Sequence, residues 1–396
     1  MITVEQAQAL CLALVQTVET ETIALADADG RTLADPLMAK RDQPPFPASA
    51  MDGYAIHSSD AKNGATLTVI AESAAGHGWN GTLKAGQAVR IFTGAPVPSG
   101  ADQVVIQENV TREKYTITLG ADAMFNINIR QQGADFKKEF ILKSPRKLRP
   151  SDLALIAAMN HATVRVIRRP KVALISTGDE LLMPGGDPAP DQIIASNVFA
   201  LKAMLSNTGA VANVLPIAPD TPEGLDDILQ QAEDWGADII VTIGGASVGD
   251  HDLVAPALNR FGVNRSFHKI AMRPGKPLMA GAKGVTAFLG LPGNPVSAVV
   301  CSHLFLLPMV RSALGLSDVL PRGITARLEA PIPAGGPRAH YMRAHFTENE
   351  SSRTVTPFAK QDSSMLTVLA EANCLLLSPI DDTPKVAGDL AIIYPI

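Results

Sequence analysis

Three short loops in the second half of the chain have residue types that bind anions, and they fall within about fifty residues of one another. Glycine lets the backbone approach a ligand closely and point its N–H groups at an anion. The middle loop and its approach add Lys269, Arg273 and Lys276, and such cations hold phosphate or other oxyanions. The clustering therefore predicts a pocket for an oxyanion or a phosphate. The loops are GGASVGD (244–250), MRPGKP (272–277) and LPGNP (291–295).

The elements that must position these loops are strands of an open α/β sheet. The first loop follows the apolar run DIIVTI (238–243) and the third follows TAFLG (286–290), which predicts a buried strand before each loop. Ligands bind at the strand ends of such sheets. Strand-like and helix-like runs alternate from Lys171 to Leu320, and this alternation is typical of a mostly parallel sheet with helices on both faces.

The turn after the predicted strand KVALIS (171–176) contains Thr177, Gly178 and Glu180. One interpretation is a turn that caps the next helix, because Thr and Asp are good capping residues. The other is a magnesium site, because a carboxylate at this sheet edge supplies the oxygen ligands that Mg²⁺ needs beside a phosphate. Glu180 is the better candidate ligand, since Asp179 suits the turn itself.

The first and third loops also have purely structural interpretations. Asp250 and Asp252 are either helix-capping residues or carboxylates that bind a metal or position water. In the third loop, proline near a helix start and glycine in a tight turn require no ligand. The alternative for the first loop is an anion cradle at a helix N-terminus. The candidate binding residues of the two loops are Gly244, Gly245, Ser247, Gly249, Pro292, Gly293, Asn294 and Pro295.

A serine hydrolase is a weaker alternative for the same segment. The string GASVG (245–249) satisfies the glycine-x-serine-x-glycine pattern, and a later Glu329 with His340 or His345 would fit the required order of acid and histidine. This hypothesis leaves the cationic loop without a role, so we favour the oxyanion pocket.

Two turns in the first half of the chain share a design. Asp52 lies in MDGY (51–54) directly before a strand-like run, and Thr93 begins TGAP (93–96). Short strand-like runs separated by turns fill residues 54–130, so the two turns are either surface turns of a β-rich module or a shaped rim. Their repetition favours the rim. After Leu320, further short apolar runs predict a small all-β module.

The composition narrows the class of protein. The chain has 34 basic and 39 acidic residues and a net charge of −5, which argues against nucleic acid as a partner. Three scattered cysteines make a zinc site or a disulfide framework improbable. The N-terminus has no signal-peptide pattern, and the most apolar stretch (296–310) is too short to span a bilayer. We therefore expect a cytoplasmic protein that does not enter the membrane.

Seven strings, in this order, resemble the molybdopterin molybdenumtransferase family, which is related to the C-terminal part of gephyrin. They are AMDGYA, RIFTGAPVP, NIR, ISTGDEL, GGASVGD, AMRPGKP and LPGNPVSA. The resemblance implies a multidomain α/β plus β fold and a homodimer whose active site is shared between subunits. It divides the chain into a discontinuous first domain (1–45 and 140–170), an inserted β-rich domain (46–139), an α/β molybdopterin-binding domain (171–320) and a C-terminal β-barrel (321–396).

The resemblance also implies a reaction and its residues. The substrates would be adenylylated molybdopterin and molybdate, with AMP released in a Mg²⁺-dependent step and molybdenum left on the dithiolene. Carried over by position, the catalytic residues are Asp52, Glu180, Asp252, Lys269, Arg273 and Lys276. The further binding positions are Thr93, Arg130 and Asp220, and the Mg²⁺ ligands are Glu180, Asp220 and Asp252.

This sequence departs from the family pattern at several positions. Arg273 stands where the family usually has lysine, and a bidentate guanidinium differs from a compact ammonium. Gln131 and Gln132 follow Arg130 where relatives often carry more arginine. A non-catalytic pterin-binding scaffold and a tungstate-preferring enzyme are the alternatives to the molybdenum transferase. Expected partners are the molybdopterin adenylyltransferase and downstream molybdoenzymes or cofactor-maturation proteins.

Overall fold

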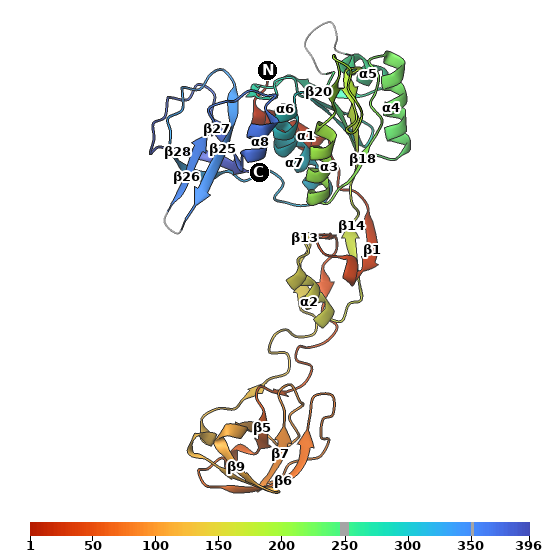
Figure 1. The fold of residues 1–396 in the computed structure, drawn as a ribbon. Helices are drawn as coiled ribbons and strands as arrows, with labels where there is room; N and C mark the ends of the chain where they lie inside the picture. Colours follow the sequence, from red (N-terminus) through yellow and green to blue (C-terminus); the bar gives the residue numbers. More distant parts are fainter. Residues whose placement is uncertain (246–252, 350–351) are drawn as a thin grey trace.

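The computed structural model describes residues 1–245, 253–349 and 352–396 and shows an elongated molecule (Figure 1). An α/β unit and the C-terminal strands lie at one end, a β-rich unit lies at the other, and a small sheet lies between them. The multidomain α/β plus β fold class predicted from the sequence is confirmed. The predicted domain boundaries remain predictions. The candidate site residues Ser247, Gly249 and Asp252 lie outside the described residues.

The sheet of the α/β unit has six strands. Four neighbouring strands, counted from one edge of the sheet, run parallel to one another. The other two run antiparallel and complete the sheet. Every residue of β19 is buried, as expected for a strand that is covered on both faces. In pairing order the strands are β18 (Val211–Val214), β15 (Lys171–Ser176), β19 (Ile239–Ile243), β23 (Thr286–Leu291), β22 (Met279–Lys283) and β20 (Asn264–His268).

Helices cover both faces of this sheet, as the alternation in the sequence predicts. The first helix begins after a capping box formed by Thr3 and Gln6, and it packs Ala7 and Cys11 into the larger core. That core also contains side chains of the helices on its own face of the sheet, and a second core lies under the other face. The first face carries α1 (Val4–Ala13), α3 (Asn197–Thr208), α6 (Pro295–Cys301) and α7 (Leu307–Ala313), and the second carries α4 (Pro222–Asp234) and α5 (Val254–Arg260).

The apolar stretch near residue 300 forms a longer helix than the sequence indicated. It runs from Pro295 to Ala313 through α6, a π-helical turn and α7, and its 19 residues are long and apolar enough to cross a membrane. The argument from length is therefore wrong. Among the described residues it is the one helix that passes this test, and 78% of its apolar window is buried inside the protein. Such burial is typical of the core helix of a globular protein.

The C-terminal strands close into a five-stranded barrel, because β25 pairs with both β26 and β27. Along β28, Ala391 and Ile393 point into the barrel core while Leu390 and Ile392 are exposed, which is the alternation expected of a strand with one buried face. The strands are β25 (Ala339–Glu348), β26 (Arg353–Pro357), β24 (Ile324–Leu328), β28 (Leu390–Pro395) and β27 (Cys374–Ser378), and α8 (Leu366–Glu371) lies between β26 and β27.

The barrel is joined to the α/β unit by one short strand. β21 (Met272–Arg273), which is part of the predicted cationic loop, pairs in parallel with the start of β25. The backbone of Ala339 also donates to the carbonyl of Ala271 over 3.0 Å. The cationic loop is therefore fixed to the barrel as well as to the α/β sheet.

The β-rich unit is a six-stranded sheet at the far end of the molecule (Figure 1). Gly53 is required where β5 crosses β8, because a Cβ there would lie 1.9 Å from the carbonyl oxygen of Val105. In pairing order the strands are β8 (Gln103–Ile106), β5 (Gly53–Ile56), β7 (Gln87–Ile91), β6 (Thr66–Ser73), β10 (Thr116–Leu119) and β9 (Val110–Glu113).

The small middle sheet takes strands from both sides of the β-rich unit in the sequence, as a discontinuous unit must. Its strands are β1 (Thr20–Ala24), β14 (Thr163–Ile167), β2 (Thr32–Leu33) and β13 (Arg146–Lys147), with α2 (Pro150–Ala158) packed beside them. The ribbon formed by β3 (Leu37–Met38) and β12 (Ile141–Leu142) leads on to the β-rich unit.

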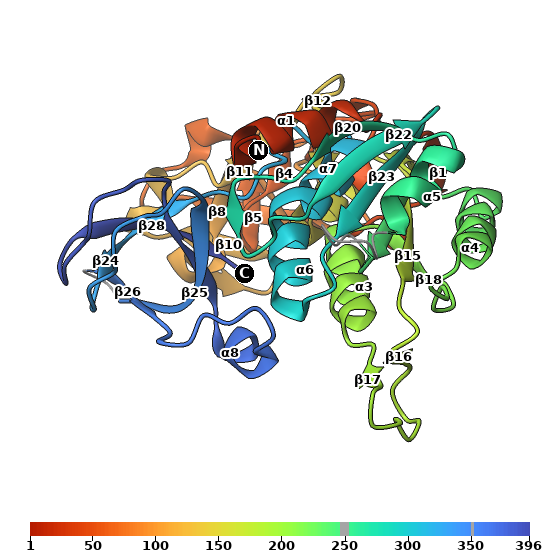
Figure 2. The ribbon, with the colours of Figure 1, turned by 90° about the horizontal axis from the view of Figure 1, so that it is seen from above.

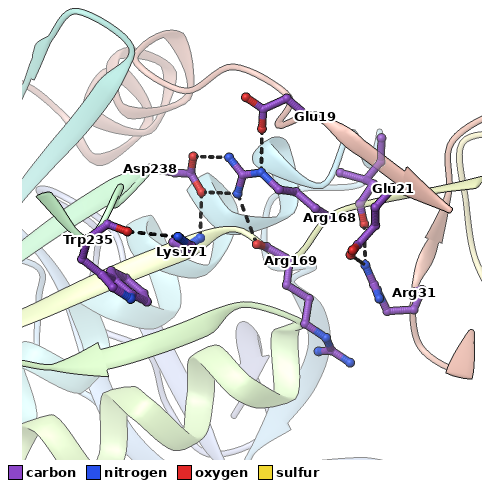
Figure 3. A network of polar contacts seen from close by, with 9 residues as sticks. Glu19, Glu21, Arg31, Arg168, Arg169, Lys171, Trp235 and Asp238 are labelled. Carbon is purple, nitrogen blue, oxygen red and sulfur yellow. Dashed lines mark hydrogen bonds and ion pairs between the residues drawn. The ribbon is translucent and has the colours of Figure 1, made fainter. Parts of the chain in front are cut away.

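A polar network ties the middle sheet to the α/β unit (Figure 3). The guanidinium of Arg168 donates two hydrogen bonds of 2.7 Å to the carboxylate of Asp238 and one of 2.6 Å to Glu19. The same carboxylate accepts from the backbone of Lys171 over 2.7 Å. Bidentate pairs of this kind have a fixed geometry, so the network sets the direction in which the chain leaves the α/β sheet.

Candidate active site

The predicted loops meet at the carboxyl edge of the α/β sheet. Thr177 follows β15, Gly244 follows β19 and Pro292 follows β23, and these three strands are neighbours. The antiparallel strand β22 begins beside Gly290, so Pro277 at the end of the cationic loop reaches the same edge. Together they line a cavity of about 630 Å³. Its wall contains Thr177, Glu180, Gly244, Gly245, Pro277, Pro292, Gly293, Asn294 and Pro295.

The wall of this edge cavity is packed backbone against backbone. A Cβ on Gly244 would lie 2.8 Å from the carbonyl oxygen of Thr177, and one on Gly245 would lie 2.5 Å from Val254. Both glycines have positive φ, +100° and +61°. A Cβ on Gly293 would touch the Cα of Gly244 at 3.4 Å. Glycine is therefore required here by both conformation and space.

Two buried polar atoms in the wall have no hydrogen-bond partner among the described residues. The hydroxyl of Thr177 is one, on a residue that is 3% exposed, and the carbonyl oxygen of the Asn197 side chain is the other. The amide of Asn197 donates to the carbonyl of Gly293 over 2.7 Å, so this side chain is fixed beside the third loop. Buried groups left unpaired in this way are expected where a ligand completes the bonding.

Glu180 lies over its own turn at the edge of the cavity. A Cβ on Gly178 would lie 2.3 Å from a carboxylate oxygen of Glu180, so the glycine makes room for the folded-back side chain. Asp220 lies beside this turn, because its backbone donates to the carboxylate of Asp179 over 3.0 Å. The structure thus brings Glu180 and Asp220 to one edge. Among the residues that the structure describes, no group of three metal-ligating side chains is close enough to hold an ion.

The three predicted cations do not share one cavity. Lys269 and Lys276 are half-buried, and neither is among the residues that line the edge cavity. Arg273 is exposed and lines a second cavity, of about 620 Å³, between the cationic loop and the barrel. The three predicted cations are therefore spread around the loop, and Arg273 lies on the side of the loop that faces the barrel.

Three basic residues line the second cavity, and two of them were not predicted from the sequence as parts of an oxyanion site. Arg338 and His340 line it with Arg273. Burial, and then the positive charges of Arg273, Arg343 and Arg338, lower the pKa of His340 to about 4. His340 is therefore a neutral imidazole beside positive charges at neutral pH.

Arg343 lies behind this cavity and is completely buried. Its Nη2 donates to the carbonyls of Lys360 and Asp362 over 3.3 and 3.0 Å, while Nε and Nη1 have no partner in the described structure. Burial lowers the pKa of this guanidinium. In the sequence Arg343 is a single basic residue in a predicted strand. It becomes a candidate site residue only because its strand, β25, pairs with β21 of the cationic loop.

The remaining candidate residues lie in the β-rich unit, at the other end of the molecule. The Oδ1 atom of Asp52 accepts hydrogen bonds from the backbone and the hydroxyl of Thr93, over 2.7 and 2.8 Å. These bonds, the backbone one first, lower the pKa of Asp52, so it is a carboxylate at neutral pH. Arg130 in β11 (Ile129–Arg130) pairs with β4 (Ala48–Ser49), and Ser49 donates to the carbonyl of Ala95 in the Thr93 turn.

The structure brings the two turns together and separates them from the edge cavity within one chain, while the predicted rim remains a prediction (Figure 1). A projecting segment formed by β16 (Leu181–Leu182) and β17 (Ile193–Ile194) stands beside the edge cavity and contributes to its wall (Figure 2). Its side chains Ile193 and Ile194 are exposed.

An α/β domain with a glycine-lined cavity at its strand ends, joined to a barrel and to a separate β-rich unit, is also the architecture of solved proteins of molybdopterin biosynthesis. Comparison with protein families gives "MoeA N-terminal region (domain I and II)" for residues 2–160, "Probable molybdopterin binding domain" for 173–312 and "MoeA C-terminal region (domain IV)" for 325–396. The chain belongs to the molybdopterin molybdenumtransferase family.

Relatives along the full length support this assignment. The chain is 34% identical to the molybdopterin molybdenumtransferase of Nostoc sp., over 92% of this chain and 86% of the relative. It is 33% identical to that of Haemophilus influenzae, over 100% and 98%. A solved structure of the molybdopterin biosynthesis MoeA protein from Pyrococcus horikoshii superimposes with a TM-score of 0.84 at 26% identity and covers 100% of both chains. The protein is thus a transferase that inserts molybdenum in molybdenum cofactor biosynthesis.

Proposed function

We propose that the protein takes adenylylated molybdopterin and molybdate, and that it releases AMP in a Mg²⁺-dependent step that leaves molybdenum on the dithiolene. The observation that carries this proposal is the pairing of two cavities on one cationic loop. The edge cavity has glycine backbone and Glu180, and the second cavity has convergent basic side chains. The first suits a phosphorylated pterin, and the second suits a compact oxyanion such as molybdate.

Magnesium fits the acidic side of the edge cavity. Mg²⁺ is held in phosphate sites by one or two carboxylates, with substrate oxygens and waters as the remaining ligands. Glu180 and Asp220 would supply these carboxylates, together with Asp252, which lies outside the described residues. When bound, the ion would neutralise the pyrophosphate and polarise the phosphorus that is attacked. Two described acids at one edge are enough for such a site.

The residues of this chain have separate tasks in the proposed reaction. Backbone N–H groups of the glycine loop and the Thr177 hydroxyl would bind phosphate oxygens, while Lys269 and Lys276 would add positive charge around the loop. Arg273 would hold molybdate beside the buried Arg343. Water would attack the adenylyl phosphorus, the bond from that phosphorus to the bridging oxygen would break, and AMP and the molybdopterin phosphate would be the two products. Molybdate would bind the two dithiolene sulfurs and lose one oxo ligand as water, which takes the two thiol protons, so molybdenum keeps its oxidation state.

A second copy of the chain would complete the site. Asp52, Thr93 and Arg130 form one group in the β-rich unit, which lies at the opposite end of the chain from Glu180. An edge cavity and a separate acidic turn are what a shared site in a homodimer requires. We place this homodimer in the cytoplasm, between the adenylyltransferase that would supply its substrate and the molybdoenzymes that would receive its product.

The test is release of AMP by the purified protein from adenylylated molybdopterin, followed by chromatography with and without Mg²⁺ and molybdate. We expect release only when both are present. Tight binding of the substrate with no AMP in any condition would support the non-catalytic scaffold instead. Tungstate in place of molybdate, titrated over the same range, decides which oxyanion the second cavity prefers.

A further inference from the structure

Arg90 occupies an unusual place beside the Asp52 turn. Its guanidinium carbon lies 5.0 Å from the ring centre of Tyr54 and 4.9 Å from that of Phe92. Both distances are within the range of cation–π attraction. The Tyr54 ring is 3% exposed and belongs to the core of the β-rich unit, so it cannot turn away. The two rings hold the guanidinium in one position.

The hydrogen bonds of Arg90 reach the backbone that carries Asp52. Nη1 donates to the carbonyl of Gly53 over 3.3 Å, and Nη2 donates to the side-chain oxygen of Gln107 over 2.6 Å. The backbone N–H of Gln107 in turn donates to the carbonyl of Asp52 over 3.1 Å. Arg90 therefore binds the Gly53–Tyr54 peptide directly and reaches the carbonyl of Asp52 through Gln107.

The charge of Arg90 is not consumed by an ion pair. Among the described residues, no carboxylate lies within 4.0 Å of its guanidinium. Its nearest influence on an acid is on Asp52, whose pKa it lowers in addition to the larger effect of the Thr93 hydrogen bonds. Asp52 itself receives both Thr93 bonds on Oδ1, so these bonds leave Oδ2 available to a ligand.

We propose that Arg90 is a positioning residue for the molybdenum transfer reaction, which holds the Asp52 turn so that the free carboxylate oxygen points toward the substrate. This inference rests on the proposed role of Asp52. The sequence motifs gave Arg90 no role, because its position between two aromatic rings is visible only in the structure. The rings hold the guanidinium, the guanidinium donates one bond to the turn and one to Gln107, and Thr93 binds Oδ1 of Asp52.

The test uses the full-length protein and release of AMP from adenylylated molybdopterin. Arg90→Met keeps an apolar side chain between the rings but removes both bonds and the charge, and we expect kcat to fall about 10- to 100-fold with KM changed less than threefold. Arg90→Lys keeps the charge and should recover part of the loss. The matched control is Arg112→Met on the exposed strand β9 of the same sheet, which should match the wild type.

A double-mutant cycle separates positioning from simple support of the fold. If Arg90 acts through Asp52, then Arg90→Met adds no further loss of kcat in an Asp52→Asn background, because residues that act as a unit are not additive. A further tenfold loss in that background, or an Arg90→Met variant as active as Arg112→Met, overturns the proposal. A wild-type protein that binds substrate and releases no AMP would instead refute the proposed function, so the two failures are distinct.

Discussion

At the carboxyl edge of the α/β sheet the cavity wall is made of closely packed backbone, whereas in the β-rich unit the carboxylate of Asp52 is held by hydrogen bonds from Thr93. Gly244 and Gly245 have no room for a Cβ, and Thr177 behind them has an unpaired hydroxyl. Asp52, by contrast, is fixed by Thr93 and stands at the surface. The first region is a preformed binding surface, and the second is a presented functional group.

This difference indicates how the two regions would act together on one substrate. A wall that is rigid and lined by N–H groups is suited to binding an anion without rearrangement. An exposed carboxylate on a stiff turn is suited to meeting a ligand that another surface has already bound. The two descriptions are complementary, and each region alone lacks what the other supplies. The predictions below therefore test whether they function as one site in a dimer.

The largest expected effect comes from separating the two regions onto different subunits. Asp52→Asn and Glu180→Gln should each lower AMP release about 100- to 1,000-fold. When the two inactive variants are co-expressed, half of the dimers are mixed and each has one intact shared site, so activity should return to about a quarter of the wild type. AMP release by the purified mixture is the measurement.

The matched control for this experiment mixes Asp52→Asn with Arg130→Met. Both substitutions lie in the β-rich unit, so no combination of subunits restores an intact site. No recovery in the Asp52/Glu180 mixture would show that each site is complete within one chain. Recovery in the control would show that the gain in activity does not come from a shared site.

A second prediction probes the rigid wall. Gly245→Ala should lower the free energy of unfolding by about 2–4 kcal/mol, because a Cβ would meet Val254 at 2.5 Å and the φ of +61° strains any L side chain. Gly262→Ala is the control, since its φ of +87° carries the same strain but nothing lies within 4 Å. That change should cost about 1–2 kcal/mol.

Urea unfolding followed by tryptophan fluorescence measures this effect. Trp235 reports on the α/β unit, and Trp79→Phe removes the signal of the β-rich unit. If both glycine variants lose the same free energy of unfolding, the wall accommodates the added methyl group without loss of stability and is not a rigid surface.

The sequence was sufficient for the rigid wall and insufficient for the basic cavity. Contiguous motifs beside clear strand patterns could be found from the local sequence alone. These motifs are the glycine loops, the Glu180 turn, and the Asp52 and Thr93 turns. Arg343 is a lone cation in a β-strand, and its significance depends on barrel closure and on the pairing of β21 with β25. Such long-range placement has no local signal. Tertiary contacts also extended the core helix to Ala313, beyond the predicted range.

A third prediction tests the basic cavity against the edge cavity. Arg343→Leu removes a buried guanidinium that has no ion-pair partner in the described structure but donates to two backbone carbonyls, so we expect the free energy of unfolding to fall by about 1–3 kcal/mol. The molybdate concentration needed for half-maximal AMP release should rise at least tenfold, because a charge beside the oxyanion is lost. Arg327→Met on the exposed side of the barrel is the control. An unchanged molybdate requirement would exclude this cavity as the molybdate site.

The smallest expected effect concerns pH and distinguishes the basic cavity from another buried histidine. The pKa values of His340 and His303 are both lowered to about 4, in each case mainly by burial. Between about pH 6.5 and pH 4 the unfolded chain therefore binds protons that the folded protein does not, so stability falls as pH falls through this window. His340→Asn and His303→Asn should each reduce the loss of stability between pH 6.5 and pH 4 by about 1 kcal/mol.

Molybdate should reduce this loss of stability only when His340 is present, because an anion among Arg273, Arg338 and Arg343 favours the protonated imidazole. Unfolding midpoints measured across this pH range with and without molybdate test the difference, and an equal response from the His340→Asn protein would place the oxyanion elsewhere.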